Sequence, residues 1–120
     1  MRVLIVEGRE TLGELWQAHV MRQGYRVDLV RTQDAAIGAL QTAEYDVIVL
    51  ALVLKEGAAL AVSDFASYRQ PDARVIFVSS ASFFSDGSIF NHSPNARALF
   101  SCDGRPSDLA AMVEHYGMVG

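Results

Sequence analysis

The apolar residues of this chain fall into short runs separated by segments with a longer spacing. Val3–Val6 and Asp46–Ala51 are nearly continuous apolar runs, as is typical of strands covered on both faces of a sheet. The segment "YRVDLV", residues 25–30, alternates between apolar and polar positions. "RVIFVSS", residues 74–80, and "ALFS", residues 98–101, are further apolar runs. Together these segments predict five β-strands.

Between the runs, apolar residues recur at spacings of three and four, which predicts amphipathic helices. In the first of these segments the recurring positions are Leu12, Leu15, Trp16, His19 and Val20. Gly24 follows at a position typical of a helix C-cap, and Thr32 can cap the next helix. A third helix is expected from Leu60 to Tyr68, before Pro71, and Pro106 opens the last one at its first turn.

Strands that alternate with helices predict a parallel sheet with helices on both faces. One segment departs from this pattern, because residues 79–95, "SSASFFSDGSIFNHSPN", are rich in poor helix formers. We expect a short or irregular fourth helix there. Sites in such folds lie beyond the carboxyl ends of the strands, so any functional residues should follow the strand ends.

Composition and charge narrow the classes of function. The chain has 120 residues, which suits one domain spanning residues 1–120, and 51% of them are hydrophobic. The net charge is -4 and the basic residues are scattered, so we expect neither a nucleic-acid nor a membrane surface as partner. Cys102, as the only cysteine, cannot form an internal disulfide, which favours a cytoplasmic protein.

Three segments resemble the receiver domain of bacterial two-component response regulators. "MRVLIVEGRE" is similar to that family's first strand and acidic pair. "EYDVIVLALVLKEG" is similar to its central strand and following loop, and "VIFVSS" to its fourth strand. The likeness covers nearly the whole chain. It implies a flavodoxin-like α/β three-layer sandwich, with five parallel strands in the order 2-1-3-4-5 and helices on both faces.

The resemblance also implies a phosphorylation site. In the family, two acidic residues after the first strand and an Asp at the end of the third hold Mg²⁺, and that Asp accepts a phosphoryl group from a histidine kinase. A Ser or Thr after the fourth strand and a Lys after the fifth bind the phosphoryl oxygens. The carboxylate is the nucleophile, and the metal neutralises the developing charge.

Carried onto this chain, the match is incomplete. Glu7 stands at the first acidic position, but Gly8 stands at the second and Ala51 at the phosphoacceptor position. Ser79 matches the hydroxyl position, with Ser80 just beyond it. Asp103 stands where the Lys is expected, although one gap in the alignment would place Arg105 and Pro106 there instead. We therefore expect no catalytic residue and no bound metal or other cofactor.

Basic residues lie near the same strand ends. Arg9 and Lys55 are expected to flank the former metal cleft, and Asp103 to enter it. An ion pair of Arg9 with Asp103 or Glu7 could occupy the space. The alternative is that Arg9, Lys55 and Ser79 hold a small anion or a nucleotide.

These features favour a binding module over an enzyme. We expect a phosphorylation-independent receiver-like domain that acts in signal transduction through contacts with a protein partner or with a second copy of the chain. In receivers the usual contact surface is formed by the fourth helix, the fifth strand and the fifth helix. Here that face would include Phe83, Phe90, Phe100 and Met112.

Overall fold

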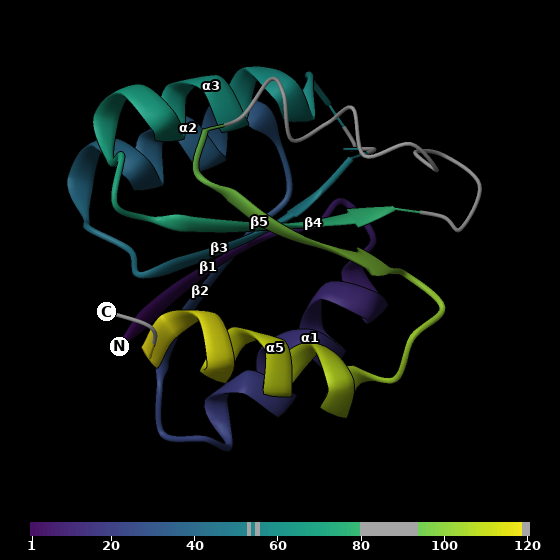
Figure 1. Ribbon diagram of the computed structural model, residues 1–120. Helices are drawn as coiled ribbons and strands as arrows, with labels where there is room; N and C mark the ends of the chain where they lie inside the picture. The colour runs from purple at the N-terminus through teal and green to yellow at the C-terminus, as the bar shows by residue number, and fades with distance from the viewer. Residues whose placement is uncertain (53, 55, 80–93, 119–120) are drawn as a thin grey trace.

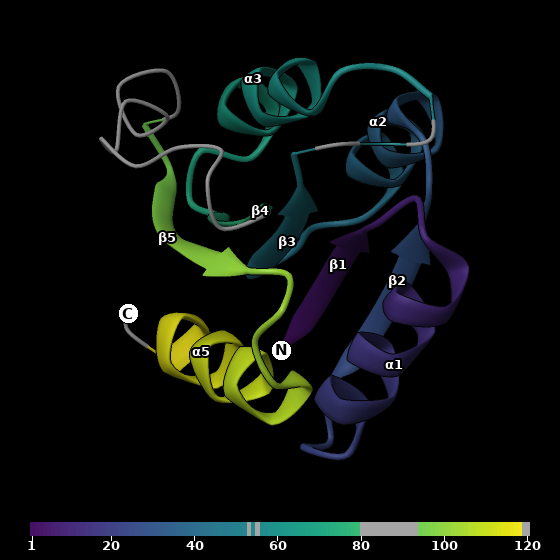
Figure 2. The ribbon, with the colours of Figure 1, turned by 90° about the vertical axis from the view of Figure 1, so that its right-hand side faces the viewer.

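The computed structural model describes residues 1–52, 54, 56–79 and 94–118. Its centre is a five-stranded parallel sheet with the order β2-β1-β3-β4-β5 (Figures 1 and 2). The strands are β1 (Arg2–Val6), β2 (Arg26–Val30), β3 (Val47–Ala51), β4 (Arg74–Ser79) and β5 (Ala96–Ser101). The predicted fold class and strand order are confirmed.

Helices cover the sheet on both faces, as Figure 1 shows. The helices α1 (Glu10–Met21) and α5 (Pro106–Met118) lie on one face, and α2 (Gln33–Thr42) and α3 (Ala59–Arg69) lie on the other. The expected fourth helix, with Ser80, Phe83 and Phe90, falls in residues 80–93, which lie outside the described residues.

Two apolar clusters, one on each face of the sheet, hold the layers together. In β1, Val3 and Ile5 pack into the cluster under α1 and α5, whereas Leu4 and Val6 pack into the cluster under α2 and α3. The split follows the two-residue period of a strand, in which successive side chains point to opposite faces. All five residues of β3 are buried, and full burial of one aliphatic side chain stabilises a fold by about 1.5–3 kcal/mol.

The helix ends follow the sequence signals. The Oγ1 of Thr32 accepts a hydrogen bond from the backbone N–H of Ala35 at 3.2 Å, and Pro106 is the first residue of α5. Gly24 adopts φ +89°, a conformation that favours glycine. One expectation is corrected, because Leu15 is 42% exposed. The buried residues of α1 are Gly13, Trp16 and Val20, so the helix turns Leu15 toward solvent.

The register of the sheet brings the strand ends together. Val6 pairs with Leu50, Ala51 pairs with Val78, and Ser79 pairs with Ser101. Because the strands are parallel, the residues that follow β1, β3, β4 and β5 meet at one edge, which we name the carboxyl edge.

Candidate functional site

An ion pair between a buried carboxylate and a more exposed guanidinium occupies the carboxyl edge beside β1. The side chain of Glu7 is fully buried, and its Oε1 lies 2.8 Å from Nη2 of Arg9. Arg9 also donates from Nε to Oε1 at 3.2 Å and from its backbone N–H to Oε2 at 3.2 Å. The backbone N–H of Glu7 donates to the carbonyl of Val30, which anchors this segment to β2. Both oxygens of the carboxylate are therefore held by Arg9.

The electrostatics of Arg9 reflect this arrangement. Its hydrogen bond with Glu7 raises the pKa of Arg9 above the ordinary value, against a smaller lowering by burial, and the Cys102 side chain contributes a further, smaller rise. The thiol of Cys102 is half-buried in the turn that follows β5. Of the two partners expected for Arg9, the structure pairs it with Glu7. The carboxylate of Asp103 instead lies 3.9 Å from the Sγ of Cys102.

Ala51, Ser79 and Gly8 lie at or beside the ends of the neighbouring strands. Ala51 is the last residue of β3 and is 2% exposed, and the next residue, Leu52, donates its N–H to the carbonyl of Val78. Ser79 is 9% exposed, and its carbonyl accepts the N–H of Cys102 at 2.9 Å. Gly8, between Glu7 and Arg9, carries no side chain.

The structure thus brings some of the predicted site residues together. Glu7 and Arg9 form the ion pair, whereas Asp103 lies beside Cys102 in the turn after β5. Lys55 and Ser80 lie outside the described residues. Among the residues that the structure describes, no group of three or more His, Cys, Asp and Glu side chains could hold a metal ion.

The expected partner-binding face is altered by the burial of Phe100. Its side chain is 7% exposed and belongs to the apolar cluster under α5, and Met112 is partly buried against the same cluster. Phe100 is therefore largely buried in this structure, and the partner-binding role expected of this face stays a prediction. β5 is the last strand of the sheet, and α5 covers the ring of Phe100 from one side.

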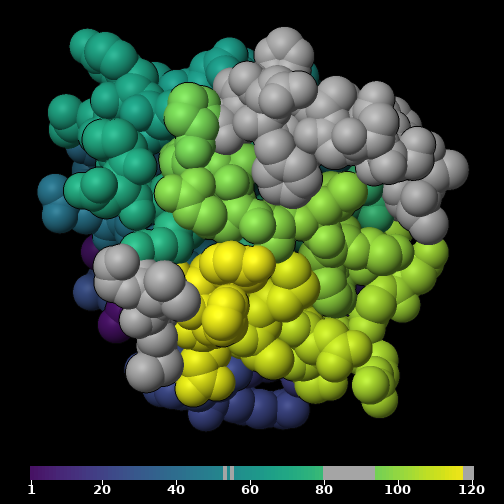
Figure 3. All heavy atoms as spheres, viewed as in Figure 1, coloured from purple at the N-terminus to yellow at the C-terminus, as the bar shows by residue number. Residues whose placement is uncertain are grey.

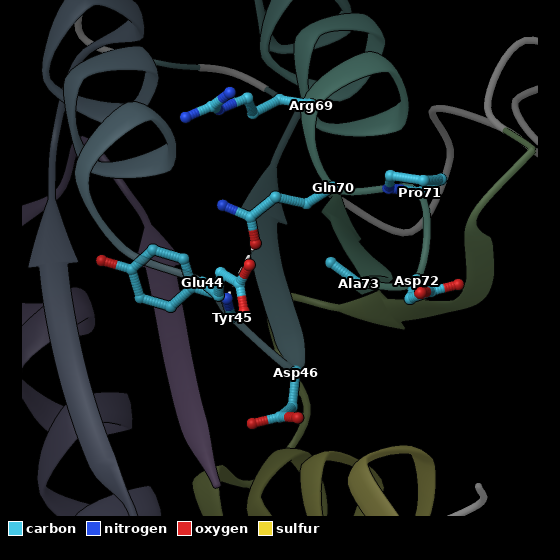
Figure 4. A pocket seen from close by; sticks show the side chains of 8 residues that line it. All are labelled: Glu44, Tyr45, Asp46, Arg69, Gln70, Pro71, Asp72 and Ala73. Carbon is cyan, nitrogen blue, oxygen red and sulfur yellow. Dashed lines mark hydrogen bonds between the residues drawn. The ribbon is translucent and has the colours of Figure 1, made fainter.

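A pocket opens at the opposite, amino edge of the sheet. It has a volume of about 390 Å³ and is lined by Glu44, Tyr45, Asp46, Arg69, Gln70, Pro71, Asp72 and Ala73 (Figure 4). The amide of Gln70 is fully engaged there: its Oε1 accepts the N–H of Tyr45 at 2.8 Å, and its Nε2 donates to the carbonyls of Leu40 and Ala43. Gln70 therefore ties the end of α2 to the start of β3, and its role is structural.

A second polar network, near the start of β1, was not anticipated from the sequence. The Oδ2 of Asp28 accepts hydrogen bonds from the Tyr45 hydroxyl at 2.7 Å and from Nη2 of Arg2 at 2.8 Å. Burial raises the pKa of Asp28, but the bonds from Tyr45 and Arg2 outweigh it and lower that pKa overall. Burial and the bond to Asp28 raise the pKa of Tyr45 to about 12. The sequence feature that could have pointed to this network is Asp28, a lone carboxylate inside the strand β2.

Comparison with known proteins bears on the fold. The chain matches no protein-family model and no curated protein sequence. Among solved structures it is similar to a signal receiver domain of a putative Luxo repressor protein from Vibrio parahaemolyticus, with 22% identity and a TM-score of 0.85 over 97% of this chain and 88% of the other. It is also similar to the non-phosphorylated HemR receiver domain from Leptospira biflexa, with 19% identity and a TM-score of 0.87 over 99% of this chain and 95% of the other.

A third similar structure is the response regulator protein TrrA from Thermotoga maritima in complex with Mg²⁺-BeF. It has 17% identity and a TM-score of 0.82, over 96% of this chain and 97% of the other. At these identities the likeness establishes the fold, which is that of a response regulator receiver domain. Within the described part of the chain, no helix is long and apolar enough to cross a membrane.

Proposed function

We propose that this domain is a receiver-like signalling module that works without phosphorylation and acts through protein contacts. The observation that carries the proposal is the ion pair between Glu7 and Arg9 at the carboxyl edge. The response regulator from Thermotoga maritima is bound to Mg²⁺-BeF in its structure. We infer that in this chain the guanidinium of Arg9 takes the place of a bound metal ion.

The side chains at this edge do not fit Mg²⁺. The metal binds oxygen ligands in near-ideal octahedral geometry and is usually held by carboxylates together with water. Glu7 supplies a single carboxylate, whose oxygens already accept bonds from the Arg9 side chain and backbone. A metal ion would have to displace the guanidinium and leave Arg9 beside a second positive charge.

Ala51 also lacks what phosphoryl transfer needs. The attacking group must be a nucleophile, and a methyl group offers no lone pair to phosphorus. The side chain of Ala51 is also 2% exposed, packed between the neighbouring strand ends. A role that does not depend on phosphate is therefore the one that these residues support best.

The alternative, an anion site formed by Arg9, Lys55 and Ser79, has less support. The guanidinium of Arg9 is engaged by the carboxylate of Glu7, and an incoming anion would face that carboxylate. We therefore favour a protein partner, or a second copy of the chain, as the ligand of the domain.

The test is to incubate the protein with acetyl phosphate and Mg²⁺ and to measure its intact mass. We expect no phosphoryl adduct in the wild type, and none in Ala51→Asp alone, because Gly8 and Arg9 remain. The triple variant Gly8→Asp/Arg9→Ala/Ala51→Asp adds two carboxylates to that of Glu7 and is the matched comparison for Mg²⁺ binding. A stoichiometric adduct on the wild-type chain that hydroxylamine removes would defeat the proposal.

A further inference from the structure

The turn between β5 and α5 contains a glycine that its backbone does not require. The N–H of Gly104 donates to the carbonyl of Ser101 at 2.9 Å, which closes the turn. Among the described residues, positive φ angles occur at Gly24 and Gly57 and not at Gly104. The left-handed backbone conformation that favours glycine is therefore not the reason for Gly104. The reason for glycine at this position must lie in what surrounds it.

The aromatic ring of Phe100 fills the space that a side chain at position 104 would need. A Cβ on Gly104 would lie 2.5 Å from Cζ of Phe100 and 3.0 Å from its Cε1. It would also lie 3.1 Å from the carbonyl oxygen of Ser101. Contacts as short as that to Cζ cannot persist, so either the ring or the turn would have to move. The ring is the tip of a stiff side chain packed in the cluster with Leu109 and Val113.

The turn itself is anchored from the other side. The N–H of Cys102 donates to the carbonyl of Ser79, and the N–H of Asp103 donates to the hydroxyl of Ser101 at 3.3 Å. Because the turn is tied to β4 and to the side chain of Ser101, it has little freedom to retreat from the ring.

We propose that Phe100 and Gly104 form a conformational lock, in which the absence of a side chain at position 104 keeps the Phe100 ring buried and fixes the turn that leads into α5. The lock rests on the proposed function and deepens it, because a module that works without phosphorylation needs a contact surface whose shape its own sequence fixes. In Figure 3, α5 (yellow) and β5 (light green) lie side by side on this face. Release of the ring would change the surface that they present together.

The test is a double-mutant cycle of Gly104→Ala and Phe100→Leu, followed by thermal unfolding and NMR. In the wild type we expect nuclear Overhauser contacts between the α protons of Gly104 and the ring of Phe100. Gly104→Ala should lower Tm by several degrees and change the contacts of the ring with α5. In the Phe100→Leu background the same substitution should lower Tm by less than half as much. Gly38→Ala is the control, because nothing lies within 4 Å of a Cβ at that position.

Each outcome of the double-mutant cycle either supports or overturns the lock. Equal losses of Tm in both backgrounds, or unchanged ring contacts in Gly104→Ala, would overturn the lock. If Gly104→Ala does not fold but the double variant does, the lock is supported. If neither folds, the obstacle is the Ser101 carbonyl rather than the ring, and the lock is overturned. A phosphoryl adduct on the wild type would defeat the proposed function while leaving this cycle readable.

Discussion

The guanidinium of Arg9 lies over the carboxylate of Glu7, with Nη2 2.8 Å from Oε1. The two partners differ in environment, because the Glu7 side chain is fully buried whereas the Arg9 side chain is 58% exposed. The buried carboxylate therefore depends on a cation that reaches it from solvent. A buried charge that loses its partner destabilises a fold far more than an exposed one does.

The first prediction concerns this dependence. Arg9→Ala should lower the free energy of unfolding by about 1–3 kcal/mol, the cost of leaving a buried acceptor without its partner. Arg31→Ala is the matched control, because Arg31 pairs with the exposed carboxylates of Glu10 and Glu14 at 3.4 and 3.9 Å. Arg31→Ala should lower the free energy of unfolding by less than about 1 kcal/mol, as is usual for ion pairs on the surface. Urea unfolding at neutral pH measures both.

The same argument predicts a rescue. In the Glu7→Gln background the buried charge is gone, so Arg9→Ala should cost much less there than in the wild type. Equal costs in the two backgrounds would mean that Arg9 stabilises the domain by packing alone. The ion pair would then no longer explain how the carboxyl edge is filled.

The second prediction is a pH dependence set by Asp28. Its pKa is lowered in the folded state, so its contribution is fully present above the ordinary value of 3.8 and is lost as the pH falls through the folded pKa. Tyr45→Phe removes the hydroxyl that lies 2.7 Å from Oδ2 of Asp28. The variant should therefore lose less stability than the wild type between pH 5 and the acid limit of folding.

The measurement is urea unfolding across that pH range, with Tyr25→Phe as the control. Tyr25 is also partly buried, against the cluster under α1, but it donates no hydrogen bond to Asp28. Tyr25→Phe should give the same change of unfolding free energy with pH as the wild type. If Tyr45→Phe and the wild type have the same slope, the hydroxyl does not set the pKa of Asp28.

Sequence reasoning reached the fold because the fold depends on repeated, local signals. The apolar runs of β1 and β3 are buried on both faces, and Thr32 caps α2 as expected. Which residues of α1 face the sheet was less predictable. Leu15 and Trp16 are neighbours with similar apolar character, and only the packed sheet decides that Trp16 is fully buried while Leu15 is exposed.

The carboxyl edge was predictable in part. Glu7 directly follows β1 and Ala51 ends β3, and because these strands are neighbours in the sheet the two residues lie at one edge. The sequence left two partners open for Arg9. The choice of Glu7 depends on side-chain geometry within one short segment. The burial of Phe100 depends on the missing side chain of Gly104, a contact between backbone and ring that no hydrophobic pattern reveals.

The third prediction compares two glycines. Gly57 has φ +92°, and a Cβ there would collide with the side chain of Gln33, so Gly57→Ala should cost about 1–2 kcal/mol or more. Gly38 lies within α2 with open space around it, so Gly38→Ala should stabilise the domain by about 0.5–1 kcal/mol. Thermal unfolding of the two variants should therefore shift Tm in opposite directions. A shift in the same direction for both would contradict this account of the turn at Gly57.

The fourth prediction concerns Gln70, the buried amide at the amino edge. Gln70→Ala leaves the N–H of Tyr45 and the carbonyls of Leu40 and Ala43 without their partner, which should cost about 1–3 kcal/mol. Hydrogen exchange of the Tyr45 amide should accelerate more than that of amides in β1.

Two further variants test the chemistry of the Gln70 amide. Gln70→Glu should be as damaging as Gln70→Ala, because a carboxylate cannot donate to the Leu40 and Ala43 carbonyls at the end of α2. Gln41→Ala, an exposed position on the same helix, is the control and should change the stability by less than about 0.5 kcal/mol. If Gln70→Glu retains wild-type stability, these two carbonyls find other partners. The amide would then not be what joins α2 to the start of β3.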